Sequence, residues 1–314
     1  MRTKGETILA LTIFHQLVIL LALLAVGWLL VKTGRLQDEK QLVAIITNAA
    51  LPALVIVVLQ APFSPGLLRD IGITALGFVV IMLAGVGVGM LALAARRPLS
   101  EVGVWAVCIT APNSVFVGWP ITYAIYGSRV MPLTAGIVVT FNLFVFVVGA
   151  WLVSLGKERT HRPNIKALML QPTIIAVIVG VFLFLMPFRL PATALSLLDL
   201  LALMATPLSM IVIGCQLARC NLRETFLDAK VYIVVAARLV VTPLVAFLLL
   251  RMFVSDPIIL GVLVIAACMP VGTSVAVIAA EQNSDAPFCS KAVLVSTVLC
   301  ILSVPVLVPL LLGT

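Results

Sequence analysis

The sequence predicts an all-α, polytopic membrane protein whose ten transmembrane helices form two inverted repeats of five. Three observations support this fold class: an apolar composition, ten apolar segments of spanning length, and a proline pattern that recurs in the second half of the chain. Of the 314 residues, 63% are hydrophobic and only 10% are charged, whereas soluble domains carry roughly 25% charged residues. Such a chain cannot cover a water-facing surface, so we expect it to lie in a lipid bilayer.

Ten segments of the sequence are long and apolar enough to cross a membrane, for which a helix needs about 20 largely apolar residues. The links between these segments are short, which favours one compact bundle. The expected spans cover residues 8–31, 41–60, 70–95, 102–124, 131–155, 165–187, 194–218, 230–251, 257–279 and 290–312.

The distribution of basic residues predicts the orientation of the chain. Links that follow odd-numbered spans contain 13 Lys and Arg residues, whereas the N-terminus and the remaining links contain 6. Because basic residues accumulate in cytoplasmic loops, we expect both termini outside the cell and residues 156–164 in the cytoplasm. Basic loops also account for the net charge of +8, so no nucleic-acid partner is expected.

Two prolines of the first half each have a counterpart in the second half at nearly the same sequence separation, which predicts an internal repeat. Pro52 and Pro207 are 155 residues apart, and Pro112 and Pro270 are 158 residues apart. Residues 1–155 and 165–314 are therefore expected to be copies of one five-span unit. Because five is odd, the second copy enters the membrane from the opposite side, which is a design found in secondary transporters.

The paired prolines of spans four and nine predict a substrate site. A proline removes a backbone donor and clashes with the preceding turn, and in lipid the freed groups need partners or a water-filled cavity. Each helix that restarts after a break presents unpaired N–H groups and a partial positive charge, which together favour an anion. The alternative is that the prolines only kink helices and that the polar residues bond neighbouring helices. The candidate binding residues are Pro112, Asn113, Ser114, Pro270, Gly272, Thr273 and Ser274.

Four amide side chains lie within other spans and need partners there. We expect Asn48 and Asn142 to contribute to the wall of the substrate cavity. Gln171 and Gln216 are interpreted as hydrogen-bonding groups between helices, where polar side chains stabilise packing in lipid. This division predicts a cavity lined by spans two, four, five and nine.

Several ionisable residues lie in or near spans, and each has a functional and a structural interpretation. Arg238 is costly in lipid, so it needs a partner or water. Its functional interpretation is an anion contact or gate near the cytoplasmic side. Its structural interpretation is an ion pair, with Glu281 as the partner, or a snorkelling side chain. Asp199 suits either a helix N-terminus or proton coupling. His15 is either a hydrogen-bonded residue in the bundle or a proton carrier.

No cofactor, metal site or enzymatic motif is expected from the sequence. The six cysteines show no C-x-x-C spacing, and there is no nucleotide-binding G-x-x-x-x-G-K-[ST] loop. Backbone carbonyls at the helix breaks are suitable ligands for Na⁺. No feature of the sequence selects among uniport, H⁺ coupling and Na⁺ coupling, so all three remain open. A membrane-embedded ligand sensor is the alternative to a carrier, and a flux assay separates the two.

Five short motifs are distributed over the spans: Asn48–Leu54, Gln171–Ala176, Pro207–Leu217, Met269–Ser274 and Ala280–Gln282. Together they resemble the motifs of the auxin efflux carrier family. The resemblance covers all ten spans and implies the fold shared with bile acid–sodium symporters, with a scaffold (spans 1, 2, 6 and 7) and a moving transport domain (spans 3–5 and 8–10) that contains two crossed, broken helices. It also implies a bacterial inner-membrane carrier of small organic anions such as malonate, malate or oxalate, an elevator mechanism, a homodimer through the scaffold, and a carboxylate contact at Asn113.

Overall fold

The computed structural model describes residues 2–91, 97–155, 170–186, 189–219 and 222–313. Within these residues every regular element is a helix, and the single isolated β-bridge is formed between two helix interruptions. The cytoplasmic loop expected at residues 156–164 lies outside the described part of the chain. The all-α class predicted from the composition is confirmed for the described residues.

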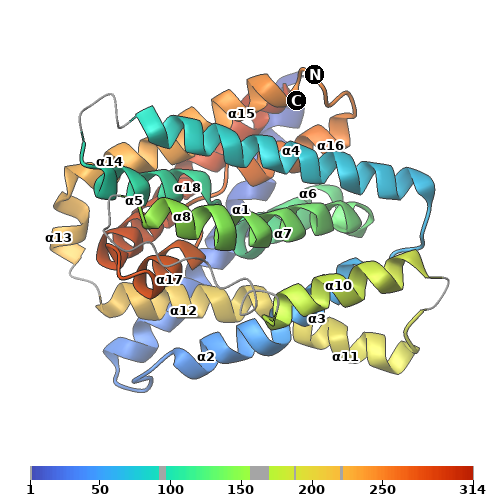
Figure 1. The fold of residues 1–314 in the computed structure, drawn as a ribbon, viewed down its shortest axis with the longest axis horizontal. Helices are drawn as coiled ribbons and strands as arrows, with labels where there is room; N and C mark the ends of the chain where they lie inside the picture. Colours follow the sequence, from blue (N-terminus) through green and yellow to red (C-terminus); the bar gives the residue numbers. More distant parts are fainter. Residues whose placement is uncertain (1, 92–96, 156–169, 187–188, 220–221, 314) are drawn as a thin grey trace.

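The helices follow one another with short connections (Figure 1). In chain order they are α1 (Arg2–Lys32), α2 (Lys40–Ile45), η1 (Ile46–Ala50), α3 (Leu51–Val58), α4 (Pro65–Met90), α5 (Leu99–Thr110), η3 (Ser114–Gly118), α6 (Trp119–Tyr126), η4 (Ser128–Val130), α7 (Met131–Phe144), η5 (Val145–Gly149), α8 (Ala150–Val153), α10 (Pro172–Leu185), α11 (Ala192–Leu203), α12 (Ala205–Arg219), α13 (Leu222–Leu227), α14 (Ala229–Ala236), η6 (Ala237–Val241), α15 (Thr242–Leu250), α16 (Pro257–Ala267), α17 (Ser274–Glu281) and α18 (Ala286–Leu312).

Seven helical stretches of the described residues are long and apolar enough to cross a membrane, so the chain is a multi-pass membrane protein. Three further apolar helices, α5, α10 and α16, are shorter than a bilayer requires. Expected spans four and nine are thus not continuous helices, because each is interrupted at its proline. Of expected span six, residues 165–169 lie outside the described residues. The seven stretches are Thr7–Lys32, Lys40–Val58, Pro65–Met90, Ser128–Val153, Ala192–Arg219, Ala229–Leu250 and Ala286–Leu312.

Short π-helical turns interrupt several of the long helical stretches. Pro52, Pro120 and Pro243 each follow such a turn by two residues, after η1, η3 and η6 respectively. A proline lacks the N–H that the preceding turn would bond and its ring crowds that turn, so the wider π turn accommodates it. Such π turns often occur at functional sites, and they were not among the features predicted from the sequence.

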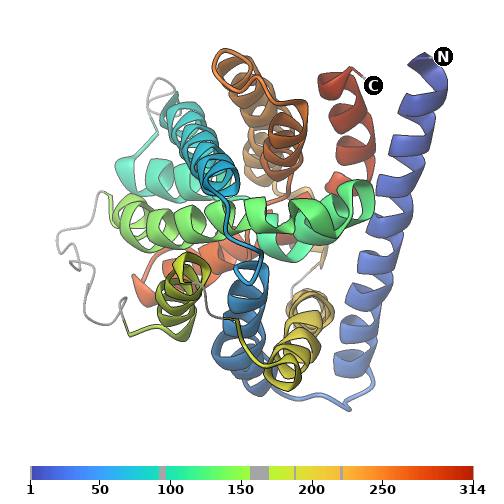
Figure 2. The same ribbon diagram turned by 90° about the vertical axis from the view of Figure 1, so that its right-hand side faces the viewer.

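The first helix packs very closely against α12 through glycines. Gly27 lies against the carbonyl of Ile211, and Gly214 lies against the carbonyl of Leu24, so neither position has room for a Cβ atom. Helix α1 also runs beside α18, and the two termini lie near one another at the top of both views (Figures 1 and 2). Small residues that let helix backbones approach are the usual means of packing helices in lipid.

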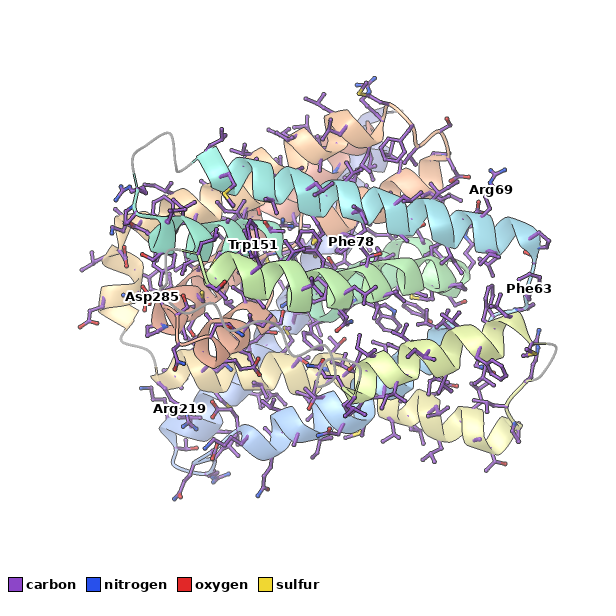
Figure 3. All side chains as sticks on the ribbon, in the orientation of Figure 1. Phe63, Arg69, Phe78, Trp151, Arg219 and Asp285 are labelled. Carbon is purple, nitrogen blue, oxygen red and sulfur yellow. The ribbon has the colours of Figure 1, made fainter. Side chains whose placement is uncertain are left out.

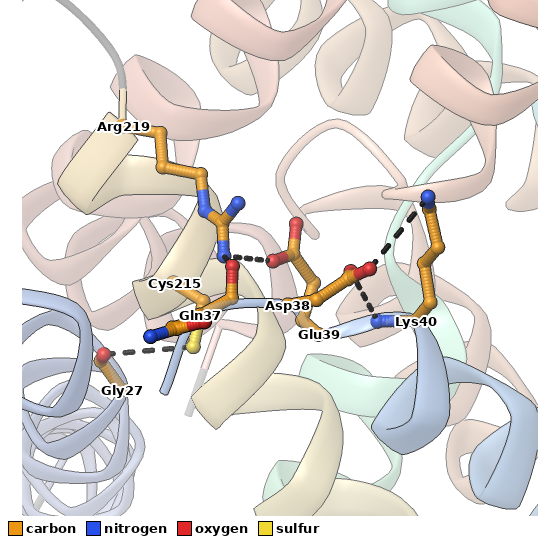
Figure 4. Close-up of polar contacts among 7 residues, drawn as sticks. All are labelled: Gly27, Gln37, Asp38, Glu39, Lys40, Cys215 and Arg219. Atoms are coloured by element: carbon orange, nitrogen blue, oxygen red, sulfur yellow. Dashed lines mark hydrogen bonds and ion pairs between the residues drawn. The ribbon is translucent and has the colours of Figure 1, made fainter. Parts of the chain in front are cut away.

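Polar contacts join the end of α12 to the connection between α1 and α2 (Figure 4). Arg219 forms an ion pair with Glu39, with 2.7 Å between Nη2 and Oε2, and donates to the carbonyl oxygen of Gln37. The backbone N–H of Lys40 donates to Asp38 and holds the pKa of that exposed carboxyl below its usual value. These contacts hold the ends of the closely packed α1–α12 pair together.

Apart from Arg238, which is fully buried, charged residues gather at the two ends of the bundle, and its core lies between them. Figure 3 shows Arg69 at one end of the molecule and Arg219 and Asp285 at the other, with Phe78 fully buried in between. Helix α4 packs against α5 and α7, and α3 packs against α10 and α11. Expected spans three to five, and likewise two and six, are therefore neighbours in space.

Candidate functional site

The two interrupted helices meet at their breaks and bond to each other through backbone atoms. Helix α5 ends at Thr110, and α16 ends at Ala267. The N–H of Asn113 donates to the carbonyl of Pro270 at 2.7 Å, and the N–H of Gly272 donates to the carbonyl of Ala111 at 2.8 Å. The two segments therefore form a short antiparallel bridge between Pro112 and Val271.

This pairing explains how unwound backbone is tolerated inside an apolar bundle. Buried N–H and C=O groups without partners are costly in lipid, and the bridge supplies partners from the other break. Ser296 of α18 adds a third contact, because its hydroxyl accepts from the N–H of Val271 at 3.0 Å. Gly272 permits the close approach, since a Cβ there would lie 3.3 Å from the carbonyl oxygens of Ala111 and Pro112.

A cavity of about 390 Å³ lies beside the paired breaks. Its volume falls within the range of roughly 300–1,000 Å³ that is typical of small-molecule sites. Both restarting helices contribute to it, η3 through Val115 and Phe116, and α17 through Ser274 and Val277. The polar or predicted residues in its lining are Thr47, Asn48, Pro112, Asn113, Asn142, Gln171, Thr173, Ser209, Gln216, Gly272, Thr273, Ser274 and Glu281.

Two polar side chains at the helix starts have atoms without a hydrogen-bond partner. Asn113 is 3% exposed, and its Nδ2 donor is unpaired. The hydroxyl of Ser274, on the other restarting helix, is also buried and unpaired. Buried polar groups are almost always hydrogen-bonded, so two unpaired groups on one cavity wall indicate a place where a polar ligand completes the bonding.

Other cavity residues have their donors engaged locally. The Nδ2 atoms of Asn48 and Asn142 donate to carbonyls one turn earlier in their own helices, at 2.9 and 2.8 Å. Gln171 and Gln216, which the sequence analysis assigned to contacts between helices, also line the cavity. That assignment was incomplete, because a polar residue that faces a cavity and one that faces a neighbouring helix give the same sequence signal.

Some of the residues singled out from the sequence lie away from the cavity. Ser114 is buried and its hydroxyl donates to the carbonyl of Ala266 at 3.4 Å. Pro270 contributes its carbonyl to the bridge and does not line the cavity. Asp199 on α11 and His15 on α1 are exposed at the helix surface and are not part of its lining.

Arg238 is completely buried behind the breaks, and its partners differ from those expected. Its guanidinium donates to three backbone carbonyls: Nε to Met269 at 3.0 Å, Nη1 to Ile109 at 3.0 Å, and Nη2 to Ala267 at 2.6 Å. The structure thus gives Arg238 carbonyl partners in place of the carboxylate of Glu281, and it does not line the cavity. The physical reason is that two helices end beside it, and the last carbonyls of a helix lack intrahelical donors.

The two sides of the paired breaks carry opposite partial charges. The helix C-termini, which carry partial negative charge, face Arg238, whereas the helix starts, which carry partial positive charge, face the cavity. Within the described residues no group of three His, Cys, Asp or Glu side chains is placed to hold a metal ion. The arrangement favours a small anion with hydrogen-bond acceptors.

Comparison with known proteins identifies the class of protein to which this chain belongs. A family model described as "Membrane transport protein" matches residues 12–165 and 157–308. The chain belongs to this family, the auxin efflux carrier family, and the expectation drawn from its motifs is confirmed. The family is one of membrane transporters and not of enzymes.

A curated relative supports the same class. An uncharacterized transporter from Methanothermobacter thermautotrophicus is 28% identical over 292 residues, which cover 91% of this chain and 94% of the relative. The similarity therefore extends over nearly the whole length of both chains.

Proposed function

We propose that this protein is a secondary carrier of small organic anions, such as mono- or dicarboxylates, that binds its substrate where two proline-broken helices cross. The single observation that carries the proposal is the unpaired side-chain Nδ2 of Asn113, buried at the start of one restarting helix and beside the start of another. An amide donor and two helix N-termini favour a carboxylate.

The proposed topology contains ten membrane crossings, of which the fourth and ninth are the broken pairs α5–α6 and α16–α17. The bridge between Pro112 and Val271 supports it, since related breaks from two inverted halves would meet in this way. We further propose a bacterial inner-membrane location with both termini periplasmic, from the basic-residue bias. Cysteine labelling at residues 156–164 tests this orientation, and a periplasmic loop would contradict it.

In this orientation the cavity opens toward the cytoplasm. Val43 near the start of the second span, Gln171 before α10, and Glu281 at the end of α17 all belong to cytoplasmic ends of spans and all line it. The conformation therefore corresponds to an inward-facing state. Transport would require spans 3–5 and 8–10 to move as one body against spans 1, 2, 6 and 7, and the closely packed α1–α12 pair suits a stationary scaffold.

Uptake of labelled dicarboxylates and monocarboxylates into proteoliposomes tests the proposed function. We expect uptake by the wild type and a loss of about tenfold or more in Asn113→Ala, because one hydrogen bond to a charged group is worth about 1.5–3 kcal/mol. Thr122→Val is the matched control, since Thr122 is buried and bonded to Gly118 but does not line the cavity. Uptake by Asn113→Ala at the wild-type rate would remove Asn113 from the site.

The same assay separates the related proposals. Binding of an anion without flux would identify a membrane-embedded sensor rather than a carrier. Imposed Na⁺ and pH gradients distinguish uniport from Na⁺ or H⁺ coupling, and crosslinking in native membranes tests the homodimer. Variants of Glu281 and Asp199 test whether either carboxylate acts in gating or coupling, and unchanged uptake in both would exclude them.

A further inference from the structure

Arg238 is the largest fully buried side chain of the described residues. It lies on the π-helical segment η6, between α14 and α15, and its hydrogen bonds reach two other helices. None of the ion pairs formed by described residues includes it. A buried guanidinium that bonds only to backbone carbonyls needs a physical explanation, since charge is expensive at this depth.

The three carbonyls provide that explanation. Ile109 is in the last turn of α5, Ala267 is the last residue of α16, and Met269 lies two residues further on, in the break. Carbonyls at these positions lack intrahelical donors and together carry the negative ends of two helix dipoles. Two helix C-termini that converge on one point need a cation between them.

Membrane carriers with broken helices commonly place a bound Na⁺ ion at such carbonyls and helix C-termini. Here the guanidinium occupies that position, and each of its nitrogen atoms donates to a different carbonyl at 2.6–3.0 Å. An arginine is always protonated and its planar fork fixes the directions of its donors. Its charge is thus permanent and cannot dissociate during a transport cycle.

The guanidinium is also coupled to the cavity through one stretch of backbone. The carbonyl of Met269 accepts from Arg238, and the carbonyl of the next residue, Pro270, accepts from the N–H of Asn113. Chains of hydrogen bonds polarise one another in a low-dielectric interior. Arg238 therefore orients the peptide groups that hold Asn113 and adds positive charge behind it without contacting the ligand.

We propose that Arg238 is a built-in cation that replaces a bound Na⁺ ion at the paired breaks, so that the crossing is assembled and the anion is bound without Na⁺. Arg238 is a positioning residue in this scheme. The part that concerns anion binding rests on the proposed function, whereas the part that concerns the cation does not.

Thermal unfolding of the purified full-length protein, without any anion substrate, tests the cation role. For the wild type we expect the same unfolding midpoint in NaCl, KCl and choline chloride. For Arg238→Ala we expect the midpoint to fall by about 10 °C, since several buried acceptors lose their donors, and to recover in part when dilute guanidinium chloride is added. Urea, which has a similar shape but no charge, should give no recovery.

Arg251→Ala is the matched control. Arg251 ends the same helical stretch, stacks on Phe247 with 5.6 Å from its Cζ to the ring centroid, and is exposed. Its midpoint should respond to guanidinium and urea as the wild type does. If Arg238→Ala does not fold, Arg238→Lys keeps the charge with different geometry and should retain a folded state of lower midpoint.

Three results would overturn the proposal. The first is selective stabilisation of the wild type by Na⁺ over K⁺ and choline, which would reveal a separate Na⁺ site. The second is equal recovery of Arg238→Ala by urea and guanidinium, which would reduce the role to filling space. The third is an unchanged midpoint in Arg238→Ala. None of these depends on finding a transported anion, so failure of the proposed function is recognised separately by absence of anion binding and uptake.

Discussion

Where the two broken helices meet, the side that faces Arg238 differs from the side that faces the cavity. Toward Arg238, three carbonyl groups each have a donor from one guanidinium. Toward the cavity, the side-chain Nδ2 of Asn113 and the hydroxyl of Ser274 have no hydrogen-bond partner. The same interruption of two helices thus has one side whose backbone carbonyls are bonded within the protein and one side where we expect a ligand to bind.

We therefore expect the Arg238 side of the paired breaks to have a structural role and the cavity side to have a binding role. Substitutions on the Arg238 side should mainly lower stability, and substitutions on the cavity side should mainly lower anion affinity. Four substitutions test that separation, and the largest effect is expected at Arg238.

Arg238→Gln should have the largest effect, and it should appear in stability. Glutamine supplies at most two donors and no charge, so at least one buried carbonyl loses its partner. We expect the free energy of unfolding to fall by about 3 kcal/mol. Thermal unfolding in detergent measures this change, and a midpoint equal to that of the wild type would show that the three hydrogen bonds are not needed.

Asn113→Asp should have the next largest effect, and it should appear in anion binding. The side chain keeps its shape but changes from a donor to a carboxylate, and like charges placed together cost several kcal/mol. We expect a loss in anion affinity of about 100-fold or more at neutral pH. Acidic pH should restore part of the affinity by protonating the new carboxyl. Anion binding is measured across pH, and an affinity equal to that of the wild type at every pH would contradict the prediction.

Gly272→Ala should have an intermediate effect on both properties. The new Cβ would lie 3.3 Å from the carbonyls of Ala111 and Pro112, so the two breaks must separate slightly. Overpacking of this kind typically costs about 1–3 kcal/mol. Unfolding and uptake measured together test the change, with Gly87→Ala as the control, because no heavy atom lies within 4 Å of the Cβ position there.

Ser274→Ala should have the smallest effect and should leave stability nearly unchanged. The hydroxyl has no partner within the protein, so its removal breaks no internal bond. We expect anion affinity to fall by roughly threefold to tenfold, which corresponds to one hydrogen bond worth about 0.5–1.5 kcal/mol. A fall in the unfolding midpoint with unchanged affinity would place Ser274 on the structural side instead.

Much of the site could be predicted from sequence because prolines in apolar segments leave a strong local signal. Pro112 and Pro270 identified both interruptions, and Asn113, Thr273 and Ser274, chosen because they follow the breaks, line the cavity. The apolar composition likewise predicted a helical membrane protein. These features depend on residues that are close together in the chain.

The partners of Arg238 could not be predicted for the opposite reason. The acceptors are backbone carbonyls 29 to 129 residues away, and carbonyls are present at every position, so nothing in the sequence marks those three. A carboxylate partner such as Glu281 was the natural expectation from charge alone. Only the convergence of two helix ends makes carbonyls sufficient.

The single arginine has a consequence for how two related halves can diverge. If the halves are copies offset by 155 to 158 residues, the position equivalent to Arg238 falls within residues 80–83, which are Val80, Ile81, Met82 and Leu83. One guanidinium already takes a carbonyl from the first half and two from the second. A second arginine would find its acceptors taken and its charge uncompensated, so duplication of the unit is compatible with only one of them. The positive charge of Arg238 would then serve the assembled pair of breaks, and not each half separately.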